Sequence, residues 1–562
     1  MCAVAGACRR PGFGEEGVLT PLRDMMRGQD NRGSEGLGIS FWNHMTGGFT
    51  SRYSNDAARN NPDLLASRLS PTLNGLAGLG HIRYRTSGAI KGRLSLQPMN
   101  IASFYDQAPA NPFEISFNGT IANADELRVE LQQLGIHFRG KTDTEVLIRL
   151  IEQIRAANTP QSSAAGSYNY ESIFRELDRR IDGGCSLCLL DSNGDMVSYR
   201  NNPGIRPLWF AQAKNGLLLT ACETSAFEEL QSSIDGKYQQ IPPGEIVQFT
   251  RAEDRIDWKF VGKPSFRKGA RPIVQPHLDA LEPIYFMRAT SEVRDGWSAS
   301  KTRFKLGQAA AHLLAPQIQG LSREDRGRSR VVAIPSTGIP YAEGFEQASG
   351  LHKTDAIEGR TRGRVFLMAT GHKRLEMAGT KHTLINEKIA GKKNWMIDDS
   401  AVRGDQMRII TRKLFEGRIN RAEQANWVIG SSPIIGIDCY GIALPSLEEL
   451  AFWQVWQQTN RHERYDLYER NKDGIIVNLE LFEKKLAQKL RAEVLHDMNR
   501  PPSAIAEDAI TIRFLPLKTL KETLPGKPED YSFHVFDANY PTLAGQAQFD
   551  RALERLQKLN AA

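Results

Sequence analysis

The sequence predicts a two-part protein, in which a strand-rich α+β half is followed by an α/β half built on a parallel sheet. Three observations support this fold class. The chain has 562 residues, more than one hydrophobic core usually needs. Residues 1–250 contain short apolar runs separated by Gly, Asn and Pro turns. Residues 284–446 alternate apolar strands with helical patterns, which is typical of a parallel sheet covered by helices.

In the first half, the expected strands are apolar segments with turn residues between them, at 75–84, 113–123, 184–200 and 216–223. The dipeptides Asn118-Gly119 and Asn193-Gly194 predict turns. Residues 142–158 have helical periodicity, and Thr142 with Glu145 forms a capping-box pattern at the start. A link rich in Pro and charged residues follows at 251–283.

In the second half, apolar strands at 331–338 and 394–400 each end in a loop and are followed by a helical pattern. A ligand crevice is therefore expected at the carboxyl ends of these strands. From Leu447 the chain is helix-rich and charged, with one more apolar strand at 510–517. Within it, residues 457–507 are expected to be a solvated insertion or an oligomer contact. The expected domains are 1–260, 284–450 and a C-terminal extension at 451–562.

Composition favours a metabolite enzyme. The net charge is +7 and the pI is near 9.0, but there is no long Lys/Arg block, aromatic-interleaved basic stripe or zinc-finger spacing, so no nucleic acid is expected as a partner. No apolar run reaches the length of a membrane span, and the first residues do not resemble a signal peptide. Six scattered cysteines do not form a disulfide framework, which indicates a cytoplasmic protein with free thiols.

Cys2 is the first candidate catalytic residue. If Met1 is removed, the free α-amine titrates near pH 8 and can act as base for the thiol of the same residue. The thiolate can then attack a side-chain amide, provided that an oxyanion hole holds the developing charge. A cysteine after the initiator methionine is common without any role, so Cys2 needs support from other segments.

Three other segments give that support. Arg83 and Thr86 can hold a substrate carboxylate through charged hydrogen bonds. Asn118 and the Gly119 N–H can serve as oxyanion donors, and Asp143 can bind an ammonium group. Each has an ordinary explanation alone, as an exposed arginine, a turn or a helix cap. Together they fit one ligand that carries a carboxylate, an ammonium group and a reactive amide, as glutamine does.

In their order and spacing, these segments resemble the class II glutaminase domain of the amidophosphoribosyltransferase family. The likeness continues through residues 26–30, 203–210 and 242–247. It implies an αββα sandwich of the N-terminal-nucleophile hydrolase type over the first half. It also implies roles for the residues above: Cys2 as nucleophile, Asn118 and Gly119 as oxyanion hole, and Arg83, Thr86 and Asp143 as glutamine ligands. Ala3 departs from the family, which usually has Gly there.

The second half resembles the phosphoribosyltransferase domain of the same family. The likeness rests on residues 334–345, 397–404, 440–451, 514–520 and 534–542. It implies that phosphoribosyl pyrophosphate is bound by Asp398, Asp399, Ser400, Arg403 and Gly404. It also implies that Mg²⁺ is held by Thr337, Asp398 and Asp399, whose oxygens are the ligands that Mg²⁺ prefers. The alternative for Asp398-Asp399-Ser400 is an ordinary strand-to-helix turn.

Departures from the family fall on the phosphate chemistry. Asp405-Gln406 stands where the family normally has Thr-Thr, and Asp355 stands where it typically has Arg. Glu358 looks inserted just before residues 359–361. Added carboxylates oppose a polyphosphate unless a cation compensates them. These changes keep open an altered acceptor, or a second domain that has lost its activity.

An iron–sulfur cluster is not expected. Some family members bind one through C-terminal cysteines, but Ser532 and Val535 occupy the matching Cys-x-x-Cys positions. Cys439 is a match for one other ligand at most, and one thiolate cannot hold the cluster. Cys185 and Cys188 lie in a strand pattern where residues three apart face opposite ways.

The sequence therefore predicts a glutamine-dependent amidotransferase that passes ammonia from Cys2 to phosphoribosyl pyrophosphate and gives phosphoribosylamine, as in purine synthesis. The expected partners are glutamine and a sugar-phosphate acceptor, with no membrane, in a cytoplasmic homo-oligomer. The alternatives are a paralogue that aminates a different acceptor and a degenerate, non-catalytic transferase domain.

Overall fold

The structure is a computed structural model of the whole chain. It describes residues 1–562 except 11, 14–15, 34, 44–45, 55–61, 68–74, 85–94, 108, 159–167, 251–254, 262–276, 295, 360–381, 418–420, 445 and 561–562. The candidate site residue Thr86 lies outside the described residues, as do residues 360 and 361, which follow Gly359.

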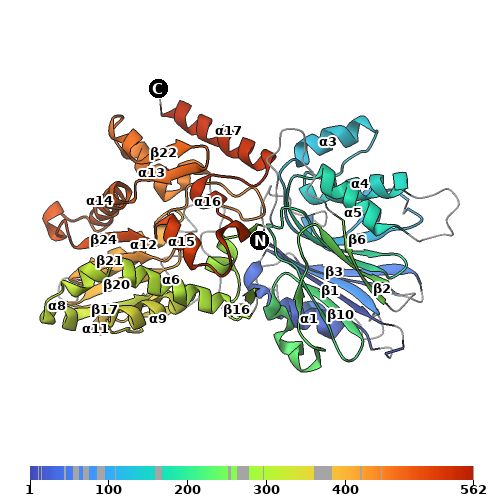
Figure 1. The fold of residues 1–562 in the computed structure, drawn as a ribbon, viewed down its shortest axis with the longest axis horizontal. Helices are drawn as coiled ribbons and strands as arrows, with labels where there is room; N and C mark the ends of the chain where they lie inside the picture. The colour runs from blue at the N-terminus through green and yellow to red at the C-terminus, as the bar shows by residue number, and fades with distance from the viewer. Residues whose placement is uncertain are drawn as a thin grey trace.

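Two antiparallel sheets form the centre of the first half (Figure 1). The seven-stranded sheet has the order β11-β9-β10-β1-β4-β2-β3, with bounds Gln239–Gln240, Trp209–Gln212, Leu217–Ala221, Ala3–Arg9, Ala77–Arg83, Gly36–Asn43 and Gly48–Ser54. The six-stranded sheet has the order β13-β12-β8-β7-β6-β5, with bounds Arg255–Phe260, Glu245–Thr250, Met196–Arg200, Gly183–Asp191, Phe113–Ile121 and Met99–Asn100.

Helices cover the outer face of each sheet, so the half has the layers α, β, β, α (Figure 1). The helices are α1 (Leu19–Gly28), α2 (Pro62–Ser67), α3 (Ala124–Gln133), α4 (Asp143–Asn158) and α5 (Tyr170–Arg180). Strand β1 shows why the layers form. Ala3, Ala5 and Ala7 pack in the core that contains α1, whereas Val4 and Cys8 pack between the sheets. This alternation is what a strand buried on both faces requires, and the expected αββα sandwich is confirmed.

Asn118-Gly119 corrects one expectation. The pair was predicted to form a turn, but it lies inside β6, where Gly119 pairs in register with Cys185 of β7. Gly119 has φ +143°, so the strand continues only because glycine tolerates this conformation. Asn193-Gly194 does form a turn, between β7 and β8.

A parallel sheet lies at the centre of the second half, in the order β17-β20-β21-β24. Its bounds are Ser329–Ala333, Lys393–Asp398, Gln424–Ile429 and Ile510–Phe514. The surrounding helices are α6 (Ala299–Leu313), α7 (Ala315–Gln319), α8 (Arg323–Arg328), α9 (Gly338–Ser349), α11 (Asn386–Ile389) and α12 (Asp405–Phe415). As expected, a helix follows each of β17 and β20, and α9 packs on both of these strands.

The C-terminal segment completes this sheet. Its elements are α13 (Ala451–Gln458), β22 (Tyr468–Asn471), β23 (Gly474–Val477), α14 (Leu479–Asp497), α15 (Leu517–Thr523), β25 (Tyr531–Ser532), α16 (His534–Asp537) and α17 (Leu543–Leu559). Because β24 pairs with β21, the sheet extends beyond residue 450. The segment 457–507 contains the hairpin β22–β23 as well as helix α14, which packs on β24. The division into three domains stays a prediction.

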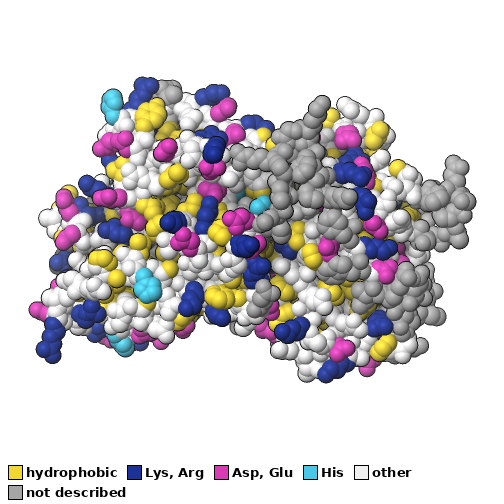
Figure 2. Space-filling model, in the orientation of Figure 1, with side chains coloured by type: hydrophobic (Ala, Val, Ile, Leu, Met, Phe, Trp, Pro, Cys, Tyr) yellow, Lys and Arg dark blue, Asp and Glu magenta, His cyan; other side chains and the backbone are white. Residues whose placement is uncertain are grey.

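The two halves meet around the N-terminus of the chain (Figure 1). Short elements at this junction include β14 (Leu278–Asp279), which pairs with β25, and a π-helical turn at Glu282–Phe286. The remaining short strands are β15 (Glu292–Arg294), β16 (Trp297–Ser298), β18 (Ile357–Gly359) and β19 (His382–Leu384). On the face in Figure 2, acidic and basic side chains are interspersed over both halves. None of the helices in the described part of the chain is both long and apolar enough to span a membrane.

Candidate active site

Cys2 directly precedes β1, a strand in the middle of the seven-stranded sheet, and its side chain is buried. The thiol contacts the backbone of Tyr84, whose N–H donates to Sγ at 3.5 Å and whose carbonyl accepts from it at 3.6 Å. Burial raises the pKa of the Cys2 thiol, and the chain N-terminus, the Tyr84 N–H and Arg83 partly offset this effect. The net effect is a raised pKa, so burial outweighs the three groups that favour the ionised thiol.

Asn118 connects the two sheets at this point. The backbone N–H of Cys2 donates to Asn118 Oδ1 at 3.2 Å, and Asn118 Nδ2 donates to Cys222 Sγ at 3.5 Å. Asn118 is fully buried, so these contacts orient its amide group. The structure thus brings together Cys2 and Asn118, two residues that are 116 positions apart in the sequence.

Gly119 has no room for a side chain. A Cβ atom at this position would lie 1.9 Å from the Gly184 carbonyl oxygen on the neighbouring strand. The close approach of the two strands fixes the Gly119 backbone directly after Asn118. A rigid backbone at this point is what a preorganised oxyanion donor requires.

Asp143 and Arg83 lie close enough to Cys2 to affect its thiol electrostatically, Asp143 raising its pKa and Arg83 lowering it. Asp143 begins α4, and its carboxylate accepts from the Ile121 N–H at 3.2 Å and from the Thr144 N–H at 2.9 Å. Burial raises the pKa of Asp143, and these two backbone donors oppose the rise. Arg83 is half-buried at the end of β4. One carboxylate and one guanidinium group thus lie in the same region as the thiol.

The second candidate site lies at the carboxyl ends of β17 and β20. Asp398 ends β20, and both Asp398 and Asp399 are buried. Thr337 precedes α9 at the adjacent strand end, where the Ile334 N–H donates to the Ile397 carbonyl at 2.9 Å. The predicted metal ligands Thr337, Asp398 and Asp399 therefore share one edge of the sheet, as parallel strands with following helices dictate.

The residues that depart from the family pair with others in this site. Gln406 Nε2 donates to Asp398 Oδ2 at 3.2 Å, and Lys353 Nζ contacts Asp355 Oδ1 at 3.1 Å. Asp405 is the first residue of α12, directly after Gly404 with φ +88°. The Ser400 hydroxyl donates to Asp399 Oδ1 at 2.6 Å.

Arg403 and Arg408 are the basic residues nearest to Asp405 in sequence. Arg403 contacts Glu449 at 3.4 Å, and Arg408 forms a two-pronged pair with Asp497 at 2.7 and 2.5 Å. Both guanidinium groups thus already have a carboxylate partner. A phosphate bound beside Asp405 would have to compete for them.

A group of ionisable side chains that sequence reasoning did not select lies between the two sites, and all are fully buried. The group comprises Arg32, Arg206, Glu223, Asp279, Glu282, Asp438 and His534. Arg32 pairs with Glu223 and Glu282, each at 2.9 Å. Arg206 contacts Asp279 at 3.0 Å and Asp438 at 3.1 Å. We call this group the junction network.

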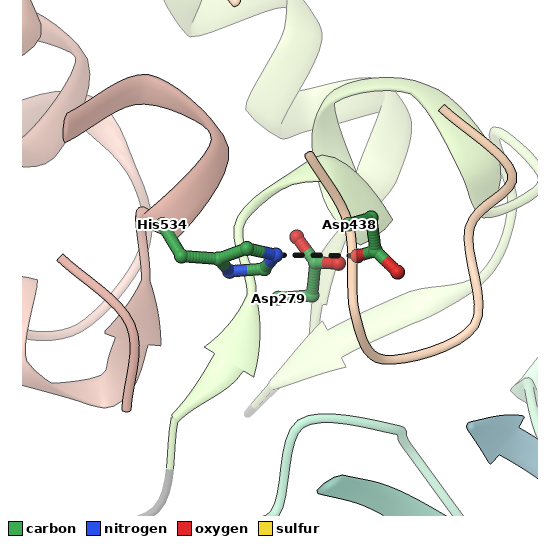
Figure 3. Close-up of side chains that lie close together, drawn as sticks. All are labelled: Asp279, Asp438 and His534. Carbon is green, nitrogen blue, oxygen red and sulfur yellow. Dashed lines mark hydrogen bonds and ion pairs between the residues drawn. The ribbon is translucent and has the colours of Figure 1, made fainter. Parts of the chain in front are cut away.

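Within the junction network, Asp279, Asp438 and His534 place possible metal ligands within 4.8 Å of one another (Figure 3). The Arg206 guanidinium, however, is already paired with both carboxylates. Burial by itself would raise the pKa of Asp438, but Arg206 and His534 lower it. The two carboxylates therefore already have the Arg206 guanidinium as their cationic partner. Asp398 and Asp399, with only oxygen donors, fit a hard cation better.

The cysteines agree with the strand pattern. Cys185 packs in the core under α4, and Cys188 packs between the two sheets, so the two thiols lie on opposite faces of β7. All six cysteines of the chain are buried with free thiols.

Comparison with known proteins now adds to this geometry. Residues 93–229 match the family model described as a glutamine amidotransferase domain. Amidophosphoribosyltransferase of Methanothermobacter thermautotrophicus is 29% identical, over 77% of this chain and 81% of that protein. Those of Archaeoglobus fulgidus and Staphylococcus epidermidis are 27% and 26% identical, each over 80% of this chain and over 87% and 80% of their own lengths. The chain resembles the amidophosphoribosyltransferases over most of its length.

Solved structures show the same fold. A glutamine phosphoribosylpyrophosphate amidotransferase from B. subtilis, complexed with ADP and GMP, superposes with a TM-score of 0.68 at 20% identity, covering 97% of this chain and 98% of that one. A structure described as the allosteric regulatory enzyme of purine biosynthesis gives a TM-score of 0.69 at 20% identity, covering 98% and 99%. The expected resemblance to amidophosphoribosyltransferases and the expected fold class are both confirmed.

The sequence did not predict the residues that hold the start of β1, nor those of the junction network. Cys222 accepts the Val4 N–H at 3.3 Å, and Gln29 donates to the Val4 carbonyl at 3.3 Å, so both hold the start of β1. Gln29 and Arg206 lie in segments that carry the amidophosphoribosyltransferase resemblance, which was a usable signal. Cys222 and the carboxylates of the junction network stand in segments with no distinctive pattern.

Proposed function

We propose that this protein is a glutamine-dependent amidotransferase that releases ammonia from glutamine at Cys2 and transfers it to phosphoribosyl pyrophosphate, giving phosphoribosylamine. The observation that carries the proposal is the contact between the Cys2 backbone nitrogen and Asn118 Oδ1, with Arg83 and Asp143 close to the thiol. The names of the curated relatives support the acceptor. We further propose a cytoplasmic homo-oligomer.

The first half-reaction uses Cys2 after it has become the N-terminal residue. Asn118 Oδ1 then accepts from the α-amine and directs the amine lone pair toward the thiol proton. The thiolate attacks the glutamine amide carbon, and the Gly119 N–H with Asn118 Nδ2 stabilises the oxyanion. The protonated α-amine gives its proton to the departing ammonia, and water hydrolyses the resulting thioester to glutamate. Arg83, Thr86 and Asp143 bind the carboxylate and ammonium of glutamine.

In the second half-reaction, ammonia attacks the sugar carbon that bears pyrophosphate, and pyrophosphate leaves. We assign the sugar phosphate to Asp398, Asp399, Ser400, Arg403 and Gly404. Mg²⁺, when bound by Thr337, Asp398 and Asp399, would neutralise charge on the leaving pyrophosphate. Gln406 occupies Asp398 Oδ2, so this pair would open for the ligand to use that oxygen.

The proposal is tested by measuring glutamate release from glutamine, with and without phosphoribosyl pyrophosphate and Mg²⁺. We expect glutaminase activity that depends on Cys2, and pyrophosphate release that depends on an ammonia source. Protein that leaves glutamine intact under all these conditions would overturn the proposal. Glutaminase activity together with no pyrophosphate release would support one of the two alternatives, an altered acceptor or a non-catalytic transferase domain.

A further inference from the structure

A loop from the second half of the chain, residues 438–442, packs directly against the backbone of Gly119. Gly441 has φ +125°, and a Cβ atom built on it would lie 2.9 Å from Gly119 Cα, 3.0 Å from its carbonyl carbon and 3.2 Å from its carbonyl oxygen. Real Cβ atoms do not approach a backbone this closely, so either Gly441 or Gly119 would have to move. The loop and the candidate oxyanion backbone are therefore in contact.

The same loop contacts the neighbouring strand. A Cβ atom on Gly184 would lie 3.0 Å from the Tyr440 carbonyl oxygen and 3.1 Å from Tyr440 Cβ. Gly184 is also the residue whose carbonyl oxygen leaves no room for a Cβ atom on Gly119. The loop therefore packs against both Gly119 and its neighbour on β7.

Asp438 gives the loop its shape. Its Oδ1 accepts three successive backbone N–H groups, from Tyr440 at 2.8 Å and from Gly441 and Ile442 at 2.7 Å. A carboxylate that accepts several N–H bonds fixes a turn more strongly than a neutral acceptor does. The loop conformation therefore depends on this one side chain.

The other oxygen of Asp438 ties the loop to the junction network. Asp438 Oδ2 accepts from Arg206 Nη2 at 3.1 Å and lies 3.2 Å from His534 Nε2 (Figure 3). Arg206 also donates to the Tyr440 carbonyl at 2.8 Å, and Ser532 contacts His534 Nδ1 at 2.8 Å. Arg206 comes from the first half and His534 from the end of the second, so both halves hold the loop.

We propose that Asp438 and Gly441 are positioning residues for glutamine hydrolysis, which hold the Gly119 N–H where the oxyanion forms. This inference rests on the proposed function, since it assigns Gly119 to the oxyanion hole. Neither residue touches glutamine. Their effect is confined to the tetrahedral intermediate, because the oxyanion donor binds charge that develops only there.

The main test is Gly441→Ala in the full chain, measured as glutaminase kcat and KM. The added methyl group displaces Gly119, so kcat should fall about tenfold to hundredfold, a part of what loss of an oxyanion donor costs. KM for glutamine should stay within about twofold, because the carboxylate and ammonium contacts remain. Gly236→Ala is the matched control. Gly236 also has positive φ, +79°, but its built Cβ meets nothing within 4 Å, so this variant should keep the parent kcat.

Two Asp438 variants separate loop shape from folding. Asp438→Ala removes the acceptor of three N–H groups and should lower kcat as Gly441→Ala does. Asp438→Asn keeps an oxygen acceptor for the three N–H groups but loses the acceptor for Arg206, so it should retain a higher kcat than Asp438→Ala without reaching the parent value. Thermal unfolding identifies any variant that fails to fold. If Asp438→Ala does not fold, the kcat of Asp438→Asn becomes the test of the proposal.

The outcomes distinguish this inference from the proposed function. A parent protein without glutaminase activity would overturn both. An active parent together with a folded Gly441→Ala or Asp438→Ala variant of unchanged kcat would overturn the positioning role alone. A rise in KM with unchanged kcat would also overturn it, because it would place the loop in glutamine binding.

Discussion

At the scale of single residues, the candidate glutaminase site depends on charges placed around one buried thiol. Burial raises the pKa of Cys2, while Arg83 lowers it and Asp143 raises it. The same two residues are the proposed ligands of the glutamine carboxylate and ammonium. Each therefore has two measurable effects, one on glutamine affinity and one on thiol ionisation.

Cys2→Ala should abolish glutamine hydrolysis, because it removes the only atom in the proposed mechanism that attacks the amide. Ammonia-dependent synthesis, which bypasses the first site, should remain. The measurement is glutamate release beside product formation from ammonium salts, with intact-mass spectrometry of the parent. Active parent protein that retains Met1 would contradict the mechanism, because its Cys2 nitrogen would be an amide and not a base.

Arg83→Leu should lower kcat/KM for glutamine by about thirtyfold, since a charge-assisted contact is worth about 2 kcal/mol. It should also move the alkaline limb of the pH profile to higher pH, because Arg83 lowers the pKa of the thiol. Asp143→Ala is the matched variant, because Asp143 raises the pKa of the thiol. Glutamine affinity should again fall, but the alkaline limb of the pH profile should move to lower pH. Profiles that shift together, or not at all, would argue against this charge arrangement.

At the scale of elements, the N-terminus of α12 determines how strongly the second site can bind a phosphate. A helix N-terminus preceded by a glycine with positive φ is a favourable place for an anion. Here the first helical residue is Asp405, and Gln406 turns its amide to Asp398. The backbone geometry of a phosphate-binding helix N-terminus is therefore present, but its first side chains are a carboxylate and an amide that pairs with Asp398.

If the acceptor is not phosphoribosyl pyrophosphate, the double variant Asp405→Thr with Gln406→Thr should bind phosphoribosyl pyrophosphate and Mg²⁺ about tenfold more tightly than the parent. The variant removes the carboxylate of Asp405, which repels phosphate, and the amide of Gln406, which competes for Asp398. The gain in binding free energy is about 1.4 kcal/mol or more. Calorimetry measures it, and Asp473→Thr on the exposed β22–β23 turn controls for net charge.

The parent and the variant together separate the possible acceptors. Tight binding by the parent without improvement in the double variant would mean that the site accommodates Asp405, and would refute an altered acceptor. Weak binding by both, without acceptor-dependent activity, would favour a degenerate domain.

At the scale of the whole molecule, the junction network joins the halves. Arg206 of the first half pairs with Asp279, Glu282 and Asp438, all of them fully buried. Asp438 in turn shapes the loop that contacts Gly119. The chain segment leading to this loop starts beside Asp398, where the Gly430 N–H donates to the Asp398 carbonyl at 2.8 Å. One continuous segment therefore touches both candidate sites.

Arg206→Leu should lower the free energy of unfolding by about 3–5 kcal/mol near neutral pH, because it leaves buried carboxylates unpaired. The loss should shrink as the pH falls. Arg206 lowers the pKa values of Asp279 and Asp438, so both values rise in the variant. The destabilisation is therefore present above the raised values and is lost as the two carboxylates are protonated below them. Burial already raises the pKa of Asp279 to about 6 in the parent.

Urea unfolding at two pH values tests the Arg206 prediction. Arg27→Leu is the control, since it removes an exposed ion pair with Asp63 and should change little. An Arg206 variant whose loss did not depend on pH would show that the network is not held by charge.

The sequence by itself determined the fold class, and it predicts Cys2 as the nucleophile. Apolar runs separated by turn residues predicted the strands of the first half, and strand–loop–helix repetition around 331 and 394 predicted the parallel sheet. Local pattern carries this information, because periodicity of side chains decides which faces are buried. Candidate site residues such as Asn118 and Asp143 were found through a resemblance in order and spacing, and their roles remain predictions.

Only the tertiary structure decided what surrounds these residues. Asn118-Gly119 has the local signal of a turn, yet pairing with β7 keeps it in a strand. Cys222 and Asp438 have no distinctive local pattern that points to their long-range partners, since Cys222 contacts Asn118 and Asp438 contacts Arg206, 104 and 232 residues away in sequence. Contacts between segments so far apart depend on how the layers and halves pack. That packing places a loop of the second half against the proposed oxyanion hole of the first.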